Sequence, residues 1–420
     1  MPTLPSPEHS EPEPPSTGLA GPSLGARAAL LSGILGLAAC QSQPLAEKTR
    51  ELAAGVYHHA LHLTDGPWSI NVIELDLSKA WEAGIRLRTA RPVAGEARLA
   101  RTSSMAGDAI AAINGGFFFD RSPSGLQISR GALVSAPRGQ SAFAISSEGV
   151  PMVAVFDIRA GMTTPSGRLL PISLFNRSPA EGKFSCFNRF AAARIDSVHA
   201  DVGFELQSLG ERSVINDTVR ARVMQVRRRG WPLKVADGQW VVAGSTGMPE
   251  EIAAGDTVGL FCLLPPAVSR LEEAIGGGPR IVRDGYPSIE YERERLGRGF
   301  AEERHPRTAV GHSQDGRTLF LVTVDGRQPG YSVGMSLAEL AGFMANDIER
   351  FSASGANAHN ALNLDGGGST TMVVANQVVN RPSDQTGERE VANALLVVAR
   401  EREGEADGSR ITSGLSLSSL

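Results

Sequence analysis

The chain contains few cysteine and aromatic residues, and it has no excess of positive charge. Only 3 of its 420 residues are cysteine, and aromatic residues make up 5%. With 41 Lys and Arg against 45 Asp and Glu, the formal net charge is -4. No nucleic-acid partner is expected, because phosphate backbones are neutralised by an excess of Lys and Arg. The apolar content of 41% predicts a full core, in one large domain or two closely joined ones.

No apolar run near the N-terminus is long enough to span a membrane. Arg27 precedes "AALLSGILGLAA", which ends at Cys40, whereas a spanning helix needs roughly 20 apolar residues. This length is typical of a signal sequence, and "LAAC" resembles the bacterial lipobox, in which the cysteine is lipidated. An ordinary secretory signal or a short buried helix is the alternative. A lipidated Cys40 predicts an exported cell-envelope lipoprotein on the outer membrane or its periplasmic face.

Several common active-site motifs are also absent. The sequence contains no CxxC or HExxH zinc motif, no phosphate loop or GxGxxG fingerprint, and no GxSxG nucleophile elbow. No cofactor is therefore required by a motif, although calcium or another divalent cation stays compatible with the Asp-rich turns. Apart from Cys40, only Cys186 and Cys262 remain. They either form one disulfide or stay as free thiols. The number of subunits is not determined.

The order of short apolar runs predicts an α+β fold, with a mixed, largely antiparallel sheet and packed helices. Strands are expected at 68–77 and 109–119, and hairpins at 308–327 and 370–380. Helical spacing appears at 267–275 and over 336–351, where Ser336 and Glu339 form a capping-box pattern.

The domain boundaries follow from composition. We expect a disordered start plus signal at 1–40, a tether at 41–55, the main domain at 56–402 and a disordered tail at 403–420. Residues from about 150 to 260 are dense in short alternating runs, which indicates an inserted β-rich subdomain.

Four stretches share one pattern, in which an apolar strand meets glycines and a polar residue. They are "AINGGFF", "GGGPRIV", "TVDGRQPG" and "NLDGGGST". Glycines at strand ends allow a ligand to approach the backbone N–H groups. Each stretch alone is also explained as an ordinary turn. Together they suggest one site for an anion.

A family resemblance rests on seven motifs in order: "AINGGFF", "GGGPRIVRDG", "HPRTAVG", "VDGR", "NLDGGGSTTMV", "VVNRPSD" and "REVANAL". In this order they resemble the phosphodiester glycosidase family over roughly 68–400. The resemblance implies a hydrolase that cleaves the glycosidic C–O bond of a sugar-1-phosphodiester in a glycan, glycolipid or wall polymer. The alternatives are a non-catalytic binding or assembly protein of envelope polysaccharide, and a metal-dependent phosphodiesterase.

The departing phosphate in such a reaction already carries its charge, so the site needs cations around the phosphate and a carboxylate facing the sugar. The expected catalytic residues are Asp325, Asp365, Arg307, Arg327 and, in reserve, Glu303. The expected substrate-binding residues are Asn114, Gly115, Gly116, Arg280, Thr308, Gly326, Gly366, Gly367, Gly368, Ser369 and Asn393.

For several of these residues the alternative is a purely structural role. An Arg beside a turn Asp often forms a surface ion pair of under about 1 kcal/mol. Asn393 lies in an apolar run, so it either braces a loop or serves the site. Asp384 either caps a turn or contributes to a cation site, and His359 is either a surface residue or a ligand.

Overall fold

The chain is mostly β. The computed structural model describes residues 44–64, 66–92, 98–191, 200–210, 213–228, 235–245 and 251–399. Strands account for 47% of the structure and helices for 10%, so the expected α+β fold with packed helices is wrong. The apolar spacing at 267–275 is one source of the error, because it belongs to strand β20, Leu271–Gly276. There Glu273 is buried and accepts hydrogen bonds from Thr89, so tertiary partners override the helical pattern.

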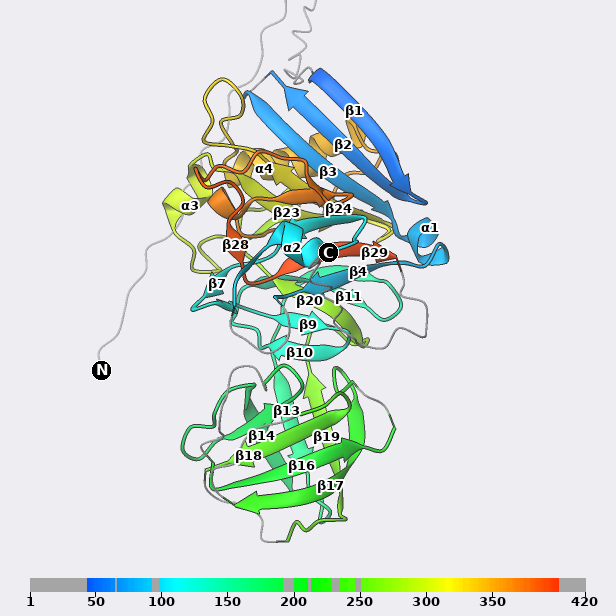
Figure 1. Ribbon diagram of the computed structural model, residues 1–420, viewed down its shortest axis with the longest axis vertical. Helices are drawn as coiled ribbons and strands as arrows, with labels where there is room; N and C mark the ends of the chain where they lie inside the picture. Colours follow the sequence, from blue (N-terminus) through cyan, green and yellow to red (C-terminus); the bar gives the residue numbers. More distant parts are fainter. Residues whose placement is uncertain are drawn as a thin grey trace, which may run out of the picture. The chain divides into compact units, whose positions relative to one another are not determined.

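The largest sheet has eight strands, paired antiparallel in the order β1-β2-β3-β24-β23-β25-β21-β22 (Figure 1). Their bounds are β1 Pro44–Ala53, β2 Val56–Leu63, β3 Trp68–Asp76, β24 Thr318–Val324, β23 Arg307–His312, β25 Asn360–Asn363, β21 Arg280–Arg283 and β22 Tyr286–Pro287. Strand β3 is buried on both faces, because Ile73 and Ile70 belong to different core clusters. Much of the segment expected as a tether, 41–55, forms the edge strand β1.

Two smaller sheets share a hydrophobic core with one face of the eight-stranded sheet. One has the order β27-β26-β6-β29-β4, with bounds Gln377–Val378, Met372–Val374, Ala111–Asn114, Ala394–Ala399 and Ile85–Ala90. The other has the order β10-β9-β20-β11-β12, with bounds Ala132–Ser135, Gln127–Ser129, Leu271–Gly276, Ser141–Ser146 and Pro151–Val155. Residues Ile113 and Phe143 of these sheets share one core cluster with Leu321 of β24. Short pairs join β5 (Ala100–Arg101) to β28 (Glu390–Val391), and β7 (Phe118–Phe119) to β8 (Ser122–Pro123).

The described helices are short, and the longest helical segment packs on the other face of the eight-stranded sheet. Helix α4, Leu337–Gly342, begins at the expected capping box of Ser336 and Glu339. It continues as a π-helix at Phe343–Asp347 and a 3-10 helix at Ile348–Arg350, and its apolar residues share a core with β24. The remaining helices are α1 Leu77–Glu82, α2 Thr102–Ala106 and α3 Arg298–Glu302.

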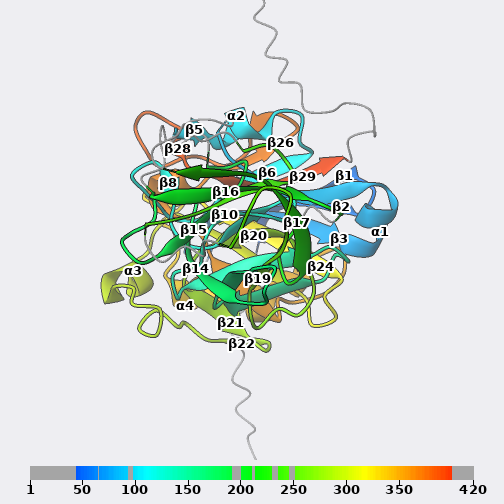
Figure 2. The same cartoon turned by 90° about the horizontal axis from the view of Figure 1, so that it is seen from below.

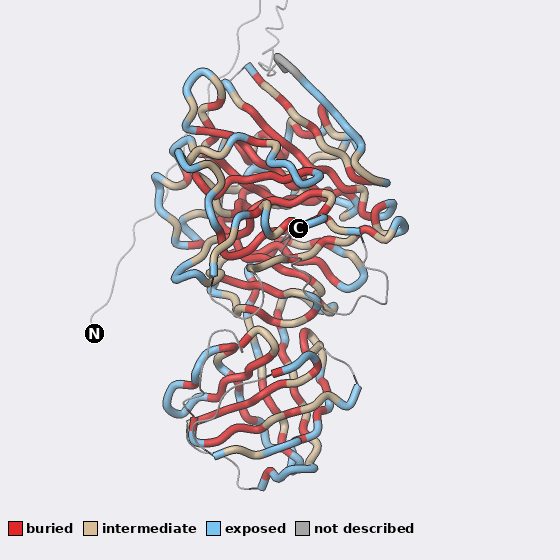
Figure 3. The backbone as a smooth tube through the Cα atoms, in the orientation of Figure 1, coloured by how far each residue is buried: buried red, intermediate tan, exposed pale blue. Residues whose placement is uncertain are grey.

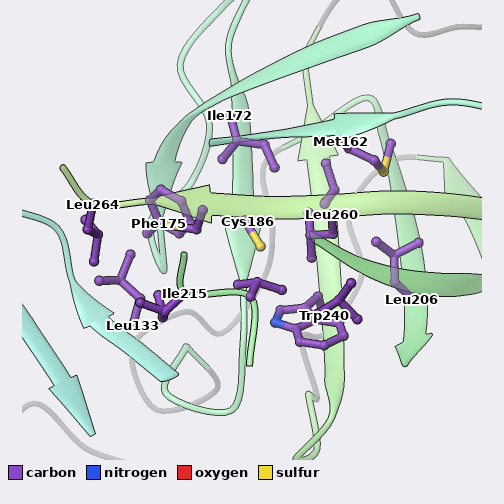
Figure 4. Close-up of a cluster of buried hydrophobic side chains, with 14 of the residues drawn as sticks. Leu133, Met162, Ile172, Phe175, Cys186, Leu206, Ile215, Trp240, Leu260 and Leu264 are labelled. Carbon is purple, nitrogen blue, oxygen red and sulfur yellow. The ribbon is translucent and has the colours of Figure 1, made fainter. Parts of the chain in front are cut away.

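Strands between residues 159 and 263 close into a barrel, green in Figure 1 and seen from below in Figure 2. The order is β13-β14-β15-β18-β16-β17-β19, with bounds Arg159–Thr163, Leu169–Phe175, Phe184–Phe187, Gln239–Gly244, Val202–Ser208, Thr218–Arg228 and Thr257–Leu263. Buried and exposed residues alternate along β14 and most of β17 (Figure 3), whereas β15 and β18 are buried almost throughout. Its interior is apolar (Figure 4) and contains Cys186 and Cys262 as free, buried thiols. The expected subdomain boundaries stay a prediction.

Candidate active site at the glycine loop

The strand ends that carry glycines meet at one edge of the eight-stranded sheet. Arg307, at the start of β23, lies opposite Val324, at the end of β24. Asn363 ends the neighbouring strand β25, and its carbonyl accepts a hydrogen bond from the N–H of Gly278 at 2.8 Å. The N–H of Asp365 donates to the carbonyl of Gly115 at 3.1 Å. All four stretches with the glycine pattern therefore come together.

Asn114 fastens these strand ends to one another. Its Nδ2 donates to the carbonyl of Asp365 at 2.7 Å, and its Oδ1 accepts from Thr308 Oγ1 at 2.7 Å and from the N–H of Thr371 at 3.1 Å. Both Asn114 and Thr308 are fully buried. The structure gives these two expected substrate-binding residues a bracing role, because a buried amide is stable only with its hydrogen bonds made.

Three consecutive glycines make room for groups of the chain itself. A Cβ at Gly366 would lie 2.6 Å from the carbonyl oxygen of Pro306. Gly367 has a φ of +61°, and a Cβ there would lie 3.2 Å from both terminal nitrogens of Arg327. At Gly368 a Cβ would collide with the paired side chains of Asp384 and Arg389. The loop 366–368, which we call the glycine loop, therefore lets two guanidinium groups approach the backbone.

The other expected glycines have close neighbours as well. A Cβ at Gly115 would collide with Asn393, one at Gly116 with the carbonyl of Gly276, and one at Gly326 would lie 2.6 Å from Pro306 N. Asn393 is buried, and its Nδ2 donates to Gln127 Oε1 at 3.2 Å. Its backbone carbonyl accepts from the N–H of Gly115 at 2.9 Å, and its Oδ1 is buried without a hydrogen-bond partner in the described structure. Whether Asn393 braces the loop or serves the site stays a prediction.

Asp365 is the half-buried carboxylate at the head of the glycine loop. Its Oδ1 accepts a hydrogen bond from the N–H of Gly366 at 3.0 Å. Burial raises the pKa of Asp365 to about 6, while the Ser369 hydroxyl, the Gly366 N–H and the charge of Arg389 act in the opposite direction. A carboxyl group with this pKa is mostly ionised at pH 7 and is able to exchange a proton near neutrality.

Asp325 is buried at the end of β24 and is held by four donors. Its Oδ1 accepts from Asn380 Nδ2 at 3.0 Å and from the N–H of Arg381 at 2.9 Å, and its Oδ2 accepts from Tyr331 at 3.1 Å and from Ser69 at 3.2 Å. Burial raises its pKa, and these hydrogen bonds oppose that effect. The contacts engage both carboxylate oxygens with protein donors. This geometry suits a positioning residue and does not support the expected role facing the sugar.

Arg307 and Arg280 are turned toward the protein interior. Arg307 donates to the carbonyl oxygens of Met335 at 2.8 Å, Phe300 at 2.7 Å and Glu303 at 2.8 Å. Burial, with repulsion from Arg327, lowers the pKa of Arg307 to about 10. The guanidinium of Arg280 donates to the carbonyl of Val153 in β12. Neither contact set supports the phosphate grip expected for these two residues.

Arg327 is exposed and lies at the glycine loop. Its Nη2 lies 3.3 Å from Nδ1 of His305, and Nε2 of His305 lies 3.4 Å from the carboxylate of Glu303. Burial and the charges of Arg307 and Arg327 lower the pKa of His305. A neutral His305 accepts at Nδ1 and presents its other N–H to Glu303. Glu303 therefore acts on Arg327 through His305.

The comparisons support the family expected from the motifs. Residues 214–398 match the sequence model of the family described as phosphodiester glycosidase. The resemblance to phosphodiester glycosidases is confirmed. Comparison with curated proteins gave no match.

Two solved structures share the fold at low sequence identity, and a third gives a lower score. A hypothetical protein from Synechocystis superposes with a TM-score of 0.62 and 22% identity, over 84% of this chain and 64% of that protein. A putative exported protein from Burkholderia pseudomallei K96243 gives 0.56 and 24%, over 79% and 74%. The catalytic domain of zebrafish N-acetylglucosamine-1-phosphodiester alpha-N-acetylglucosaminidase, auto-inhibited by its pro-peptide, gives 0.44 and 16%, over 85% and 88%. The chain thus spans less than two thirds of the Synechocystis protein.

Two residues of the candidate site were not expected from the sequence. Arg389 forms a bidentate ion pair with Asp384, with Nε–Oδ2 at 2.8 Å and Nη2–Oδ1 at 3.0 Å, beside Gly368. His305 stands directly before β23, within the motif "HPRTAVG". Their positions in family-like motifs were the available signal. Their contacts depend on pairings distant in the chain.

The structure also bears on the expected metal ligands and on membrane-spanning helices. Among the described residues, no group of three or more His, Cys, Asp or Glu side chains is arranged to hold a metal ion. His359 lies 3.7 Å from Asp284 at the surface. No helix in the described ranges is long and apolar enough to cross a bilayer. Cys40 and the rest of 1–43, like the tail after 399, lie outside the described residues.

Proposed function

We propose that the protein is an exported hydrolase that cleaves the glycosidic C–O bond of a sugar-1-phosphodiester in a glycan, glycolipid or wall polymer. One observation carries this proposal: the glycine loop gathers Asp365, whose pKa is raised to about 6, with the guanidinium groups of Arg327 and Arg389. A carboxylate next to cations matches the demands of a reaction that separates a sugar cation from a phosphate anion. The match to phosphodiester glycosidases supports the same reaction class.

In this proposal the phosphate binds beside Arg327, which is exposed and lies against Gly367. Its guanidinium stabilises the phosphate monoester that departs as an anion. His305 accepts a hydrogen bond from Arg327 and so orients it. The bond between the anomeric carbon and the phosphate oxygen breaks, and the electron pair leaves with the phosphate.

Asp365 then faces the anomeric carbon. Its carboxylate is ionised above pH 6, where it stabilises the developing positive charge or attacks the carbon. The charge of Arg389 favours this ionised form. Water supplies the hydroxyl of the released sugar, and its second proton is lost to solvent or to a base. Asp325 contributes by holding Asn380, which in turn accepts from the N–H of Met372 after the glycine loop.

The test is hydrolysis of methyl diesters of N-acetylglucosamine-, glucose- and mannose-1-phosphate by the full chain in oxygen-18 water. We expect release of reducing sugar with the label in the sugar. Asp365→Asn and Arg327→Ala should lower kcat/KM by at least about a hundredfold. The matched controls are Asp201→Asn and Arg138→Ala, which change exposed side chains and should keep full activity.

Two results would contradict this function. Label in the phosphate would show P–O cleavage, as a metal-dependent phosphodiesterase performs it. Absence of turnover on every diester, with unchanged glycan binding by Asp365→Asn, would indicate a binding or assembly protein.

We also propose that the protein is anchored in the cell envelope through a lipid on Cys40, on the outer membrane or its periplasmic face. The support is the apolar run that follows Arg27 and ends in "LAAC". Cells fed radiolabelled palmitate should label the full chain and not Cys40→Ser, and only the wild type should sediment with membranes. Equal labelling of both proteins would refute the anchor.

A further inference from the structure

The outer face of the barrel carries a set of side chains that the glycine-loop site does not use. Strands β13, β19 and β17 are neighbours, and Thr163, Gly259 and Arg220 are aligned across them. The residues next to these along each strand, such as Met162 and Leu260, belong to the buried core. Because side chains alternate along a strand, Thr163 and Arg220 point outward.

The next aligned row is centred on an aromatic ring. Phe261 lies opposite Gly161 on one side and Thr218 on the other. A Cβ at Gly161 would come within 2.9 Å of Cζ of Phe261 and 2.7 Å of Leu169. The ring therefore extends over Gly161 along the sheet surface, with the exposed Leu169 at its edge. Phe261 keeps part of its surface open to solvent.

Two arginines lie on β17, the strand paired with the strand that carries this ring. Arg220 and Arg222 are exposed on β17 and, in the described structure, form no ion pair or side-chain hydrogen bond. They are two residues apart on one strand face, so their backbones are about 7 Å apart. Gly259, opposite Arg220, has no side chain of its own, and the Thr163 hydroxyl lies 3.0 Å from where its Cβ would be. The two arginines therefore follow one another along β17, on the same outer face as the ring.

The nearby carboxylates have other partners. Glu205 of β16 pairs with Arg227, and Asp217 pairs with Arg270. Asp256, which precedes the residue aligned with Arg222, accepts a hydrogen bond from the N–H of Ala253 at 2.8 Å. The charges of Arg220 and Arg222 are therefore not cancelled by these acids, in a chain whose net charge is -4. We call the surface formed by Arg220, Arg222, Phe261, Thr163 and Leu169 the barrel face.

We propose that the barrel face binds a phosphate-bearing glycan chain, so that a polymeric substrate is held at a second place besides the glycine loop. This inference rests on the proposed function and deepens it, since it assigns a polymer as the substrate class. Two guanidinium groups at this spacing suit a phosphodiester and its neighbouring hydroxyls, and a partly exposed aromatic ring suits the apolar face of a sugar. A single ring with two arginines is too short a track for nucleic acid, which is neutralised along many phosphates.

The test measures binding of the full chain to a phosphomannan, a mannan that carries mannose-1-phosphodiesters, in the Asp365→Asn background so that no turnover occurs. The same mannan, stripped of phosphate by mild acid, is the neutral probe. We expect tighter binding of the phosphomannan. Arg220→Ser/Arg222→Ser should weaken it at least about tenfold, and Phe261→Ala about fivefold. Arg138→Ser/Arg177→Ser removes the same charge from exposed arginines elsewhere and should bind as the parent does.

Activity separates this inference from the proposed function. With the Asp365 carboxylate present, Arg220→Ser/Arg222→Ser should keep the wild-type kcat/KM on methyl mannose-1-phosphate diester and raise KM on phosphomannan. If no diester is hydrolysed and the binding effects persist, the catalytic proposal fails and the barrel face stands. Equal binding by the double variant and its control, equal binding of both mannans, or a preference for duplex DNA would overturn the barrel face. Unchanged melting temperatures of the variants exclude unfolding as the cause.

Discussion

Replacing Asp365 by Asn should make the protein more stable at high pH while removing its activity. The pKa of Asp365 is raised from the ordinary 3.8 to about 6, chiefly by burial. At ~1.4 kcal/mol per pKa unit, this shift corresponds to about 3 kcal/mol for a fully buried group. Because the carboxylate is only half-buried, solvent screening lowers the expected effect to about 1–2 kcal/mol.

The sign follows from proton linkage. A group with a raised folded-state pKa contributes its stability below pH 3.8, and that stability is lost as the pH rises through about 6. Asn is neutral at every pH, and its Oδ1 is able to keep the hydrogen bond from Gly366. The advantage of Asp365→Asn should therefore be small at pH 4 and full at pH 8.

The assay is thermal unfolding of the full chain at pH 4, 6 and 8. We expect Asp365→Asn to melt roughly 2–4 °C above the wild type at pH 8, with a smaller difference at each lower pH. Asp201→Asn, an exposed carboxylate, should follow the wild type at all three values. An Asp365→Asn protein that melts at or below the wild type at pH 8, or a gain that is independent of pH, would refute the reasoning.

Three further substitutions test the supports of the site. Gly367→Ala should lower stability by about 1 kcal/mol, because its φ is +61°, and should lower kcat/KM by displacing Arg327; steady-state kinetics with wild-type values would contradict the contact. Arg307→Lys should reduce the free energy of unfolding by about 2–3 kcal/mol, since buried carbonyls lose their donors; a denaturant titration that shows no change would exclude the brace. Asp325→Ala should cost about 2–4 kcal/mol, because the four donors that share this carboxylate lose their acceptor; calorimetry of the full chain measures this, and an unchanged melting temperature would contradict it.

The local elements were the most predictable part of the fold. The hairpin of β23 and β24 turns at Asp315 and Gly316, where Gly316 has a φ of +69° that glycine adopts without strain. The hairpin of β26 and β27 and the capping box of α4 were likewise expected. Turn and cap preferences act over a few residues, so the sequence displays them directly.

The fold class was not predictable in the same way. Strand β20 has the apolar spacing of a helix, yet it pairs with β9 and β11 on both sides. The π-helix after α4 keeps the expected apolar stripe with a different hydrogen-bond pattern. Short apolar runs fit both structures, and the neighbouring strands decide between them.

The candidate site was likewise only partly predictable from the sequence. The sequence marked Asp365, the glycines of the loop and Arg327, because glycines beside a charged residue at a strand end are an unusual local pattern. It did not distinguish them from Arg307, Arg280 and Asp325, which stand in equivalent patterns. Burial and hydrogen-bond partners separate the two groups.

By itself, the sequence determined the family resemblance, the hairpins, and the presence of glycines where something must approach the backbone. Only the tertiary structure decided what approaches: the guanidinium of Arg327 and the ion pair of Asp384 and Arg389. The physical reason is that a glycine in the sequence shows only that no side chain occupies the position. The group that fills the space comes from segments distant in the chain. The burial that raises the pKa of Asp365 has the same origin.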